Sequence, residues 1–145
     1  MSREQLFFED IQVGDVLPPL VKEAVDRIQL VRYAGASGDF NPLHTVAVYG
    51  EKAGFGGVIA HGMLIMGFVA QAVAGWVPNR CLKRFSVRFV VPTRPGDVIT
   101  VSGRVAGKRS EHGRRIVTCE VAATDQRGEL KVAGSFDADL PVRNG

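Results

Sequence analysis

The sequence predicts one α+β domain over residues 1–145, in which a curved antiparallel sheet wraps around a single central apolar helix. A chain of 145 residues is long enough to bury a core of its own, and it shows no internal repeat or linker. The segment 62–77 is apolar on every side, which indicates a helix that other structure encloses. Four segments with strand-like alternation follow it, and a sheet formed by them would supply that enclosure.

The first predicted elements are a strand at residues 20–25 and a helix at residues 26–36. Turn-forming residues precede the strand, namely Val13, Gly14, Asp15, Pro18 and Pro19. Asp26 and Gln29 have the spacing of a capping box, and Gly38 follows the helix as a stop signal. The apolar positions of this helix recur at every third residue, as Ile28, Val31 and Ala34.

A long, glycine-rich loop at residues 39–60, with one helical turn at 46–53, separates this helix from the apolar one. A long irregular segment in a compact domain is usually functional. The apolar helix at 62–77 is interrupted only by Gln71 and is shorter than the about 20 residues that a bilayer span needs. We therefore expect a buried helix and no membrane partner.

The rest of the chain alternates between apolar and polar residues in four predicted strands: 82–91, 98–106, 115–124 and 129–136. A polar hairpin loop at 108–114 and a turn at 125–128 connect the last three strands. In the first of the four, one face carries Phe85, Val87, Phe89 and Val91, and the other carries Arg84, Ser86 and Arg88. Such a pattern predicts a half-buried strand.

The composition is that of an ordinary globular protein, with 46% hydrophobic and 23% charged residues, which excludes a disordered, collagen-like or coiled-coil chain. Lysine and arginine number 18 against 15 acidic residues, and the resulting net charge of +3 favours an acidic partner only weakly. Basic runs interleaved with aromatic residues are lacking in the sequence, so we expect no nucleic-acid partner.

The two cysteines, Cys81 and Cys119, stand apart from each other and from any Cys/His cluster, so we expect small buried hydrophobic residues. The first ten residues include Glu4, Glu9 and Asp10 and contain no apolar run before a cleavage site. We therefore expect no secretory signal and a cytoplasmic protein.

Polar residues that could take part in chemistry gather in two motifs, of which the first runs from Ser37 to His44 as SGDFNPLH. The five-residue spacing of Asp39 and His44 across a proline-containing turn lets both side chains point into one cavity. A carboxylate and an imidazole held together can divide acid and base roles on one water molecule or one substrate proton. The same residues are also ordinary turn chemistry, in which Asp39 caps a turn, Asn41 forms an Asx turn and His44 is a loop histidine.

The second motif, Ala60-His61-Gly62-Met63, directly precedes the apolar helix. The Gly62 N–H would lie at a helix N-terminus, where such a donor suits a carbonyl oxygen that gains negative charge. Alternatively, Gly62 only lets the helix start tightly against the sheet, with His61 packed beside it. A metal site of Asp39, His44 and His61 is conceivable, but a ligand pair on one helical turn is missing and we expect none.

Taken together, the two motifs resemble those of a known family. The segment YAGASGDFNPLH at 33–44, followed by AHGM at 60–63, strongly resembles the MaoC-like dehydratases, which are hot-dog-fold (R)-specific enoyl-thioester hydratases. The resemblance covers nearly the whole chain, including FEDIQVGD at 8–15, VRF at 87–89 and PGD at 95–97. It implies that this chain is a single hot-dog domain.

The resemblance also implies roles for individual residues. In that family the aspartate and histidine of the first motif hold the water that adds to or leaves the substrate, which gives catalytic roles to Asp39 and His44. Gly62 would donate its N–H to the thioester carbonyl, with Asn41 and His61 as further residues of the substrate site. No metal and no cofactor is implied.

One departure from the family pattern is visible. Members usually place alanine or serine six residues after the motif histidine, where this chain has Gly50. The departure affects the segment that covers the acyl pocket, and therefore the preferred acyl length.

The implied function is the reversible hydration of trans-2-enoyl thioesters to (3R)-3-hydroxyacyl thioesters of coenzyme A or acyl carrier protein, in fatty acid metabolism. Because a lone sheet exposes an edge, we expect a homodimer, with a heterodimer or a higher oligomer as alternatives. An acyl thioesterase on the same fold would not need the pair of Asp39 and His44, and a non-catalytic acyl-binding subunit is expected to lack one of them. Arg84 and Arg88 are candidates for contact with an anionic carrier.

Overall fold

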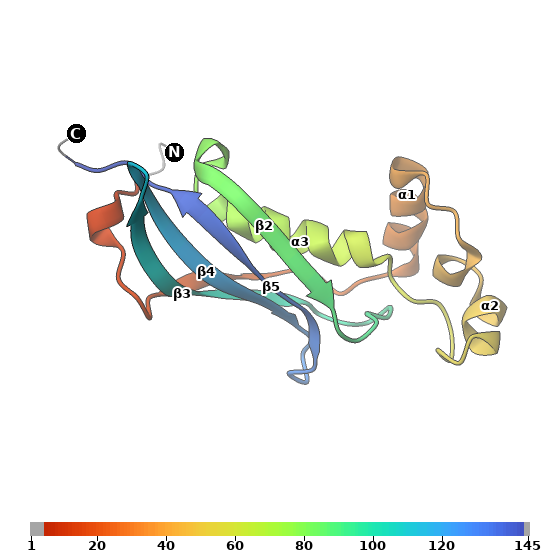
Figure 1. Ribbon diagram of the computed structural model, residues 1–145. Coiled ribbons are helices and arrows are strands. Elements are labelled where there is room, and N and C mark those ends of the chain that lie inside the picture. Colours follow the sequence, from red (N-terminus) through yellow and green to blue (C-terminus); the bar gives the residue numbers. More distant parts are fainter. Residues whose placement is uncertain (1–4, 144–145) are drawn as a thin grey trace.

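The computed structural model describes residues 5–143 and shows a curved antiparallel sheet packed on one long helix, α3 (Gly62–Trp76) (Figure 1). The sheet has the strand order β1-β3-β4-β5-β2. Its strands are β1 (Val16–Val21), β2 (Leu82–Phe89), β3 (Thr100–Glu111), β4 (Arg114–Thr124) and β5 (Leu130–Asp139). The predicted α+β class, with a sheet wrapped around an apolar helix in the hot-dog arrangement, is confirmed.

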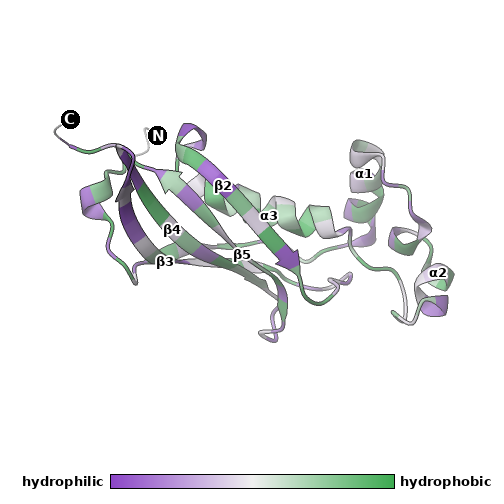
Figure 2. Ribbon diagram, in the orientation of Figure 1, coloured by the Kyte–Doolittle hydropathy of each residue, from purple (hydrophilic) through white to green (hydrophobic). Residues whose placement is uncertain are grey.

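The core lies between α3 and the inner face of the sheet. Residues that alternate along each strand supply one wall, as the banded hydropathy of the strands in Figure 2 shows, and they include Val101, Val105, Cys119, Ala123 and Phe136. The helix supplies the other wall with Leu64, Ile65, Phe68, Val69, Ala72 and Val73. Both cysteines are buried and free, as predicted.

One side of α3 is not enclosed, contrary to the expectation from its composition. Four residues spaced four apart form an exposed stripe along it: Met63, Gly67, Gln71 and Gly75. The sheet covers only one face of the helix. The exposed stripe is not evident in the sequence, because Gln71 is the one polar side chain in it.

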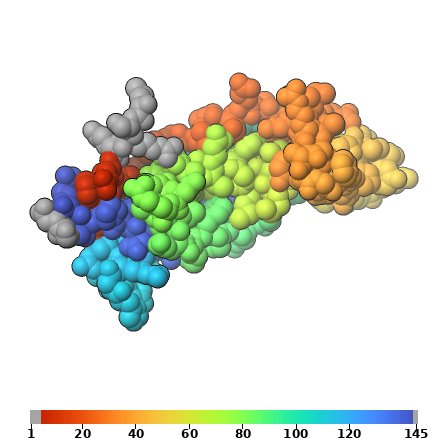
Figure 3. Space-filling view, turned by 90° about the horizontal axis from the view of Figure 1, so that it is seen from above, coloured from red at the N-terminus to blue at the C-terminus, as the bar shows by residue number. Residues whose placement is uncertain are grey.

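The hairpin between β3 and β4 differs from the prediction, because residues 108–114 are mostly strand instead of loop. The strands pair as far as Glu111 with Arg114, and only His112 and Gly113 form the turn, at φ values of 49° and 78°. Two successive residues with positive φ make the tight two-residue turn that matches the twist of a hairpin. The tip of this hairpin, cyan in Figure 3, projects from the body of the molecule.

The first strand is also displaced from its predicted position, since β1 lies at Val16–Val21 and not at 20–25. Its register against β3 is irregular between Leu17 and Leu20, where the chain has Pro18 and Pro19. Proline is tolerated there because β1 is an edge strand and the irregular stretch needs no regular N–H ladder.

Helix α1 (Arg27–Ser37) begins and ends as predicted. The Asp26 carboxylate accepts a hydrogen bond from the Gln29 N–H, and Gly38 ends the helix at a φ of 75°. Its buried residues are Leu30 and Ala34, whereas the predicted apolar positions Ile28 and Val31 are exposed. Leu30 and Ala34 are one helical turn apart, so α1 packs on the rest of the protein along a narrow line. The three-residue spacing of apolar positions therefore does not identify the buried side of this helix.

The segment 39–60 is irregular, as expected, and holds a 3-10 turn at Pro42–His44 and the short helix α2 (Ala47–Lys52). Further 3-10 turns lie at Phe8–Asp10 and Asn79–Cys81. Helices α1 and α2 lie together beyond the sheet, at the N-terminal end of α3 (Figures 1 and 3). Within residues 5–143, no helix has the length and apolarity needed to cross a bilayer.

Candidate active site

The loop after α1 is held by a chain of side-chain-to-backbone hydrogen bonds. The Asp39 N–H donates to the Ser37 hydroxyl, the Asn41 N–H donates to Asp39 Oδ1 at 3.2 Å, and the Leu43 N–H donates to Asn41 Oδ1 at 3.0 Å. These are the Asx turns that the sequence offered as an alternative to catalysis. They use one oxygen of Asp39 and leave Oδ2 directed toward His44, so the turn and the catalytic arrangement coexist.

His44 presents one defined ring nitrogen to the carboxylate of Asp39. Its Nδ1 lies 2.8 Å from the Ile59 carbonyl oxygen, which can only accept a hydrogen bond, so Nδ1 carries the hydrogen. The neutral ring then has its lone pair on Nε2, 3.7 Å from Asp39 Oδ2. The two groups are too far apart for a direct strong hydrogen bond, and one water molecule can contact both.

His61 lies behind His44 and is almost completely buried, with 1% of its surface exposed. Its ring stacks on His44 with centroids 3.8 Å apart, and Tyr33 contacts it edge-on. Nε2 lies 3.1 Å from the backbone carbonyl oxygen of Asp39 and donates to it. His61 therefore contacts both predicted catalytic residues from the protein side and is not on the cavity wall.

Burial is the main cause of a lowered pKa for His61, and it outweighs the hydrogen bond to the Asp39 carbonyl, which acts in the opposite direction. Among the described residues its Nδ1 has no hydrogen-bond partner. His61 is therefore neutral at physiological pH.

Asp39, His44 and His61 are also the one group of at least three potential metal ligands found within residues 5–143, with ligand atoms within 4.8 Å of one another. A tetrahedral zinc site needs nitrogen atoms about 2.0–2.1 Å from the ion, with lone pairs that converge on it. The two imidazole rings stack face to face with their planes inclined by only 26°, and each already uses one nitrogen on a backbone carbonyl. The arrangement suits a proton-transfer pair better than a metal ion.

A cavity of about 290 Å³ opens beside His44. Its walls come from the segment before α3, the first turns of α3, the end of β2 with the loop that follows, and the start of β5; they include Ile59, Gly62, Ile65, Phe89, Val91, Thr93, Lys131 and Val132. The lining is largely apolar with a few polar groups, as expected for a site that takes an acyl chain.

Gly62 contributes a backbone donor to this cavity. It is the first residue of α3, and within residues 5–143 its N–H has no acceptor. A Cβ at this position would lie 3.2 Å from the Phe89 ring, so glycine lets the backbone approach this ring closely. The free N–H, supported by the helix dipole, can bind an oxygen that gains negative charge.

The sequence did not identify Phe89, Thr93 and Lys131 as parts of the site. Phe89 was predicted on the core face of its strand, yet it lies at the cavity and is 53% exposed, because the sheet ends there and no longer covers it. Lys131 is a charged residue at the start of a strand and looks solvent-exposed in the sequence. Its one indication in the sequence is its position next to the apolar Val132. In the structure Val132 pairs with Phe89 at the end of β2.

The two arginines considered for carrier binding do not line this cavity. Arg84 is paired with Asp137, with Nε 3.1 Å from Oδ2, and also bonds Ser135. Arg88 lines a broad hollow on the outer face of the sheet, together with Ser86 and Ala122. Both arginines therefore belong to the face of the sheet away from α3.

Gly50, the departure from the family pattern, is explained by a close backbone contact. A Cβ at this position would overlap the carbonyl group of Gly57, and the Gly50 carbonyl accepts a hydrogen bond from the Phe55 N–H at 2.8 Å. The missing side chain lets the loop 54–58 pack directly on α2. This chain thus closes the segment next to the cavity by backbone contact.

The sequence of this chain is similar to those of known proteins. The sequence model of the MaoC like domain matches residues 12–127. A 3-hydroxybutyryl-CoA dehydratase of Methylorubrum extorquens is 30% identical over 148 residues, which cover 97% of this chain and 93% of that protein. An (R)-specific enoyl-CoA hydratase of Rhodospirillum rubrum is 29% identical and covers 99% of each chain.

Solved structures agree as well. A MaoC-like dehydratase from Rhodospirillum rubrum superposes with a TM-score of 0.83 at 25% identity, covering 97% of this chain and 99% of that one. An (R)-hydratase from Pseudomonas aeruginosa superposes with a TM-score of 0.80 at 26% identity, covering 96% of this chain and 88% of that one. Because the family's sequence model spans most of the chain and includes both motifs, this protein belongs to the MaoC-like domain family.

Proposed function

We propose that this protein is a hydro-lyase that reversibly hydrates trans-2-enoyl thioesters to (3R)-3-hydroxyacyl thioesters in fatty acid metabolism. The observation that carries the proposal is the placement of His44, whose Nε2 lies 3.7 Å from Asp39 Oδ2, on the wall of a cavity that Gly62 also lines. The names of the two full-length relatives describe the two directions of such a reaction, dehydration and hydration.

In the proposed mechanism the substrate carbonyl accepts the Gly62 N–H, and a water molecule bonds His44 and Asp39. His44 Nε2 takes a proton from the water while the oxygen bonds C3, and the electrons of the double bond move onto the thioester as an enolate that Gly62 stabilises. The proton passes from His44 to Asp39 through the new hydroxyl group, which contacts both, and Asp39 delivers it to C2. The fixed lone pair on His44 Nε2 supports His44 as the base, and the reverse sequence of steps is the dehydration.

Purified protein incubated with crotonyl-CoA tests the proposal, with the same acyl group on acyl carrier protein as a second substrate. The expected result is a fall in enoyl absorbance without release of free thiol. Release of free thiol with the double bond intact would instead show a thioesterase. Activity that appears only after a second chain is added would show a non-catalytic subunit. The more efficient of the two substrates identifies the carrier.

We also propose that the protein acts as a homodimer in the cytoplasm, without a metal or cofactor. Strand β2 is at the end of the strand order, so one of its edges is unpaired within residues 5–143. Phe89, at the end of β2, and Met63, next to Gly62 in α3, are 53% and 57% exposed and add apolar surface. Covering such an edge removes a liability to aggregation. Sedimentation equilibrium measures the oligomeric state, and a monomer at the concentrations used for catalysis would refute the dimer.

A further inference from the structure

Lys131, at the start of β5, is a buried amine on the wall of the cavity. Its side chain is 2% exposed, and Nζ donates to Glu129 Oε1 at 2.6 Å and to the Pro92 carbonyl oxygen at 3.1 Å. Asp97 and Asp125 lie at 3.4 and 3.6 Å from the same nitrogen. Lysine is almost never fully buried unless it is paired, and here three carboxylates surround the ammonium group.

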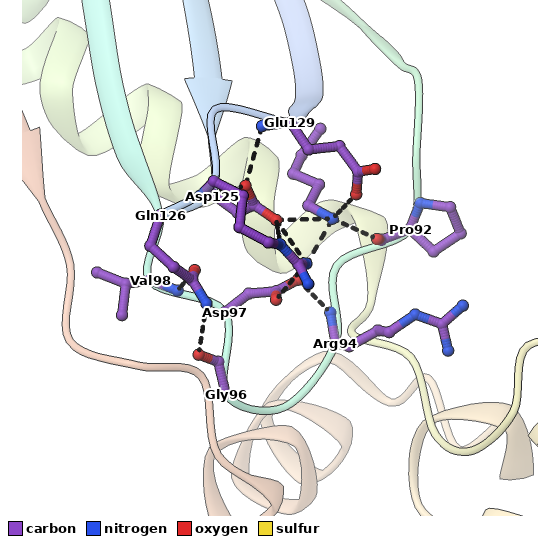
Figure 4. A network of polar contacts seen from close by, with 10 residues as sticks. Pro92, Arg94, Gly96, Asp97, Val98, Asp125, Gln126 and Glu129 are labelled. Atoms are coloured by element: carbon purple, nitrogen blue, oxygen red, sulfur yellow. Dashed lines mark hydrogen bonds and ion pairs between the residues drawn. The ribbon is translucent and has the colours of Figure 1, made fainter.

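The charges around Lys131 form one compact network, whose other members are drawn in Figure 4. Asp125 is fully buried and is bonded by Arg127 at 2.8 Å, which lowers the pKa of Asp125. For Lys131, burial opposes the charge, but the hydrogen bond to Glu129 and the charge of Asp97 outweigh burial and raise its pKa. Lys131 is therefore a fixed ammonium group, unable to exchange a proton with a substrate near neutral pH.

The network fixes the loop that follows β2. Asp97 Oδ2 accepts the Arg94 N–H at 2.9 Å, and the Gln126 side chain accepts the Val98 N–H at 2.8 Å, so the turn between β4 and β5 is joined to the loop 92–98 (Figure 4). Lys131 adds the bond to Pro92 at the cavity end of this loop. One residue further, the Thr93 carbonyl accepts the Ala60 N–H at 2.7 Å.

Ala60 is followed by His61 and Gly62, so this chain of contacts runs from Lys131 to the backbone donor. We infer that Lys131 is a positioning residue, which holds the Pro92–Thr93 segment and thereby keeps the Gly62 N–H directed at the substrate carbonyl. The inference rests on the proposed function. Lys131 lies outside both sequence motifs and beyond residues 12–127, the range that matches the family.

The test is Lys131→Met, which keeps the four-atom apolar stem of the side chain and removes the ammonium group. Lys108→Met is the matched control, because Lys108 also donates to two backbone carbonyls, at 2.6 and 2.7 Å, but does not line the cavity. The diagnostic readout is the carbonyl stretching frequency of bound butyryl-CoA, a saturated thioester, in difference infrared spectra. A hydrogen bond from Gly62 lowers this frequency, and a loss of stability alone does not change it.

For Lys131→Met we expect the carbonyl frequency to return toward its value in free butyryl-CoA. We expect kcat to fall about 10- to 100-fold with KM within about threefold of wild type, since a displaced donor costs less than the about 100- to 1,000-fold loss for a deleted one. Lys108→Met should keep the wild-type frequency and kcat. The double variant Lys131→Met/Asp97→Asn also neutralises one of the buried carboxylates that Lys131 faces, and it should fold while still showing the frequency change.

The inference is wrong if folded Lys131→Met or the double variant keeps the wild-type carbonyl frequency and kcat, or if Lys108→Met changes them equally. The wild-type protein in the same experiment separates this result from a failure of the proposed function. Hydration by wild type together with unaffected Lys131 variants refutes only the role of Lys131. Absence of hydration by wild type refutes the proposed function.

Discussion

At the scale of single residues, Asp39 and His44 are each held by the backbone at one atom and free at the other. Asp39 uses Oδ1 in an Asx turn, and His44 uses Nδ1 on the Ile59 carbonyl. Asp39→Asn keeps the oxygen that serves the turn, so we expect both Asp39→Asn and His44→Gln to fold normally. Each should reduce hydration by about two to four orders of magnitude, as expected for removal of a positioned acid or base. Steady-state rates measure the activity and a thermal melt measures the folding. If a variant retains more than about a tenth of the activity, the residue it replaces has no catalytic role.

The role of Gly62 can be separated from its small size. Gly62→Pro removes the N–H at the first position of a helix, where proline is tolerated, and should cost at least about 2 kcal/mol of transition-state stabilisation. Gly62→Ala keeps the N–H but brings a methyl group to 3.2 Å from the Phe89 ring. When Phe89→Leu makes space, the double variant with Gly62→Ala should therefore regain activity. The double variant with Gly62→Pro should not, because it still lacks the N–H. Equal rates in the two double variants would show that only space matters at this position.

His61 makes the stability depend on pH in a defined direction. Its pKa is lowered from 6.5 by burial, so below about pH 6.5 the unfolded chain binds a proton that the folded protein does not. The free energy of unfolding should therefore decrease as the pH falls from about 7 to about 5. His61→Phe retains the stacking on His44 and should show a shallower decrease over this range in urea titrations. The same slope in both proteins would mean that His61 titrates normally in the folded state.

At the scale of elements, the contact between α2 and the loop 54–58 shows what one glycine contributes. Gly50→Ala would force a Cβ into the Gly57 carbonyl, whereas Gly35 in α1 has open space around its position. We expect Gly50→Ala to lower stability by about 1–3 kcal/mol, as overpacking does. Gly35→Ala should be neutral or stabilise by up to about 1 kcal/mol, because alanine favours a helix. The midpoints of denaturant unfolding of the two variants test this prediction. Equal midpoints would contradict the close contact between Gly50 and Gly57.

The elements predicted best from sequence are those with a strong local signal. The apolar run of α3, the cap at Asp26 and the alternation in β3 and β4 are local properties, and the structure reproduces them. The side of α1 that is buried and the orientation of Phe89 depend on where other elements end, which no local pattern records. The stacking of His44 on His61 likewise depends on contacts between distant residues. His44 bonds the Ile59 carbonyl, 15 residues away, and His61 bonds the Asp39 carbonyl, 22 residues away.

At the scale of the whole molecule, the cavity lies at one end of α3 and is built from four separate parts of the chain. The motifs supply Asp39, His44 and Gly62, and their proximity could be predicted. The part of the wall that carries Lys131 could not, because a buried ammonium group is stabilised only by the folded network around it. In the proposed mechanism, the catalytic residues and the residue that positions the Gly62 N–H thus come from different regions of the sequence.

The most direct measurement is the stereochemistry of hydration in D₂O. His44 lines the cavity and its Nε2 lies 3.7 Å from Asp39 Oδ2, so in the proposed mechanism the hydroxyl group and the new proton reach the double bond from one face. Proton NMR of the product from crotonyl-CoA should show (3R)-3-hydroxybutyryl-CoA with one deuterium at C2, added syn to the hydroxyl. A (3S) product, anti addition, or crotonate released with its double bond intact would contradict the proposed reaction.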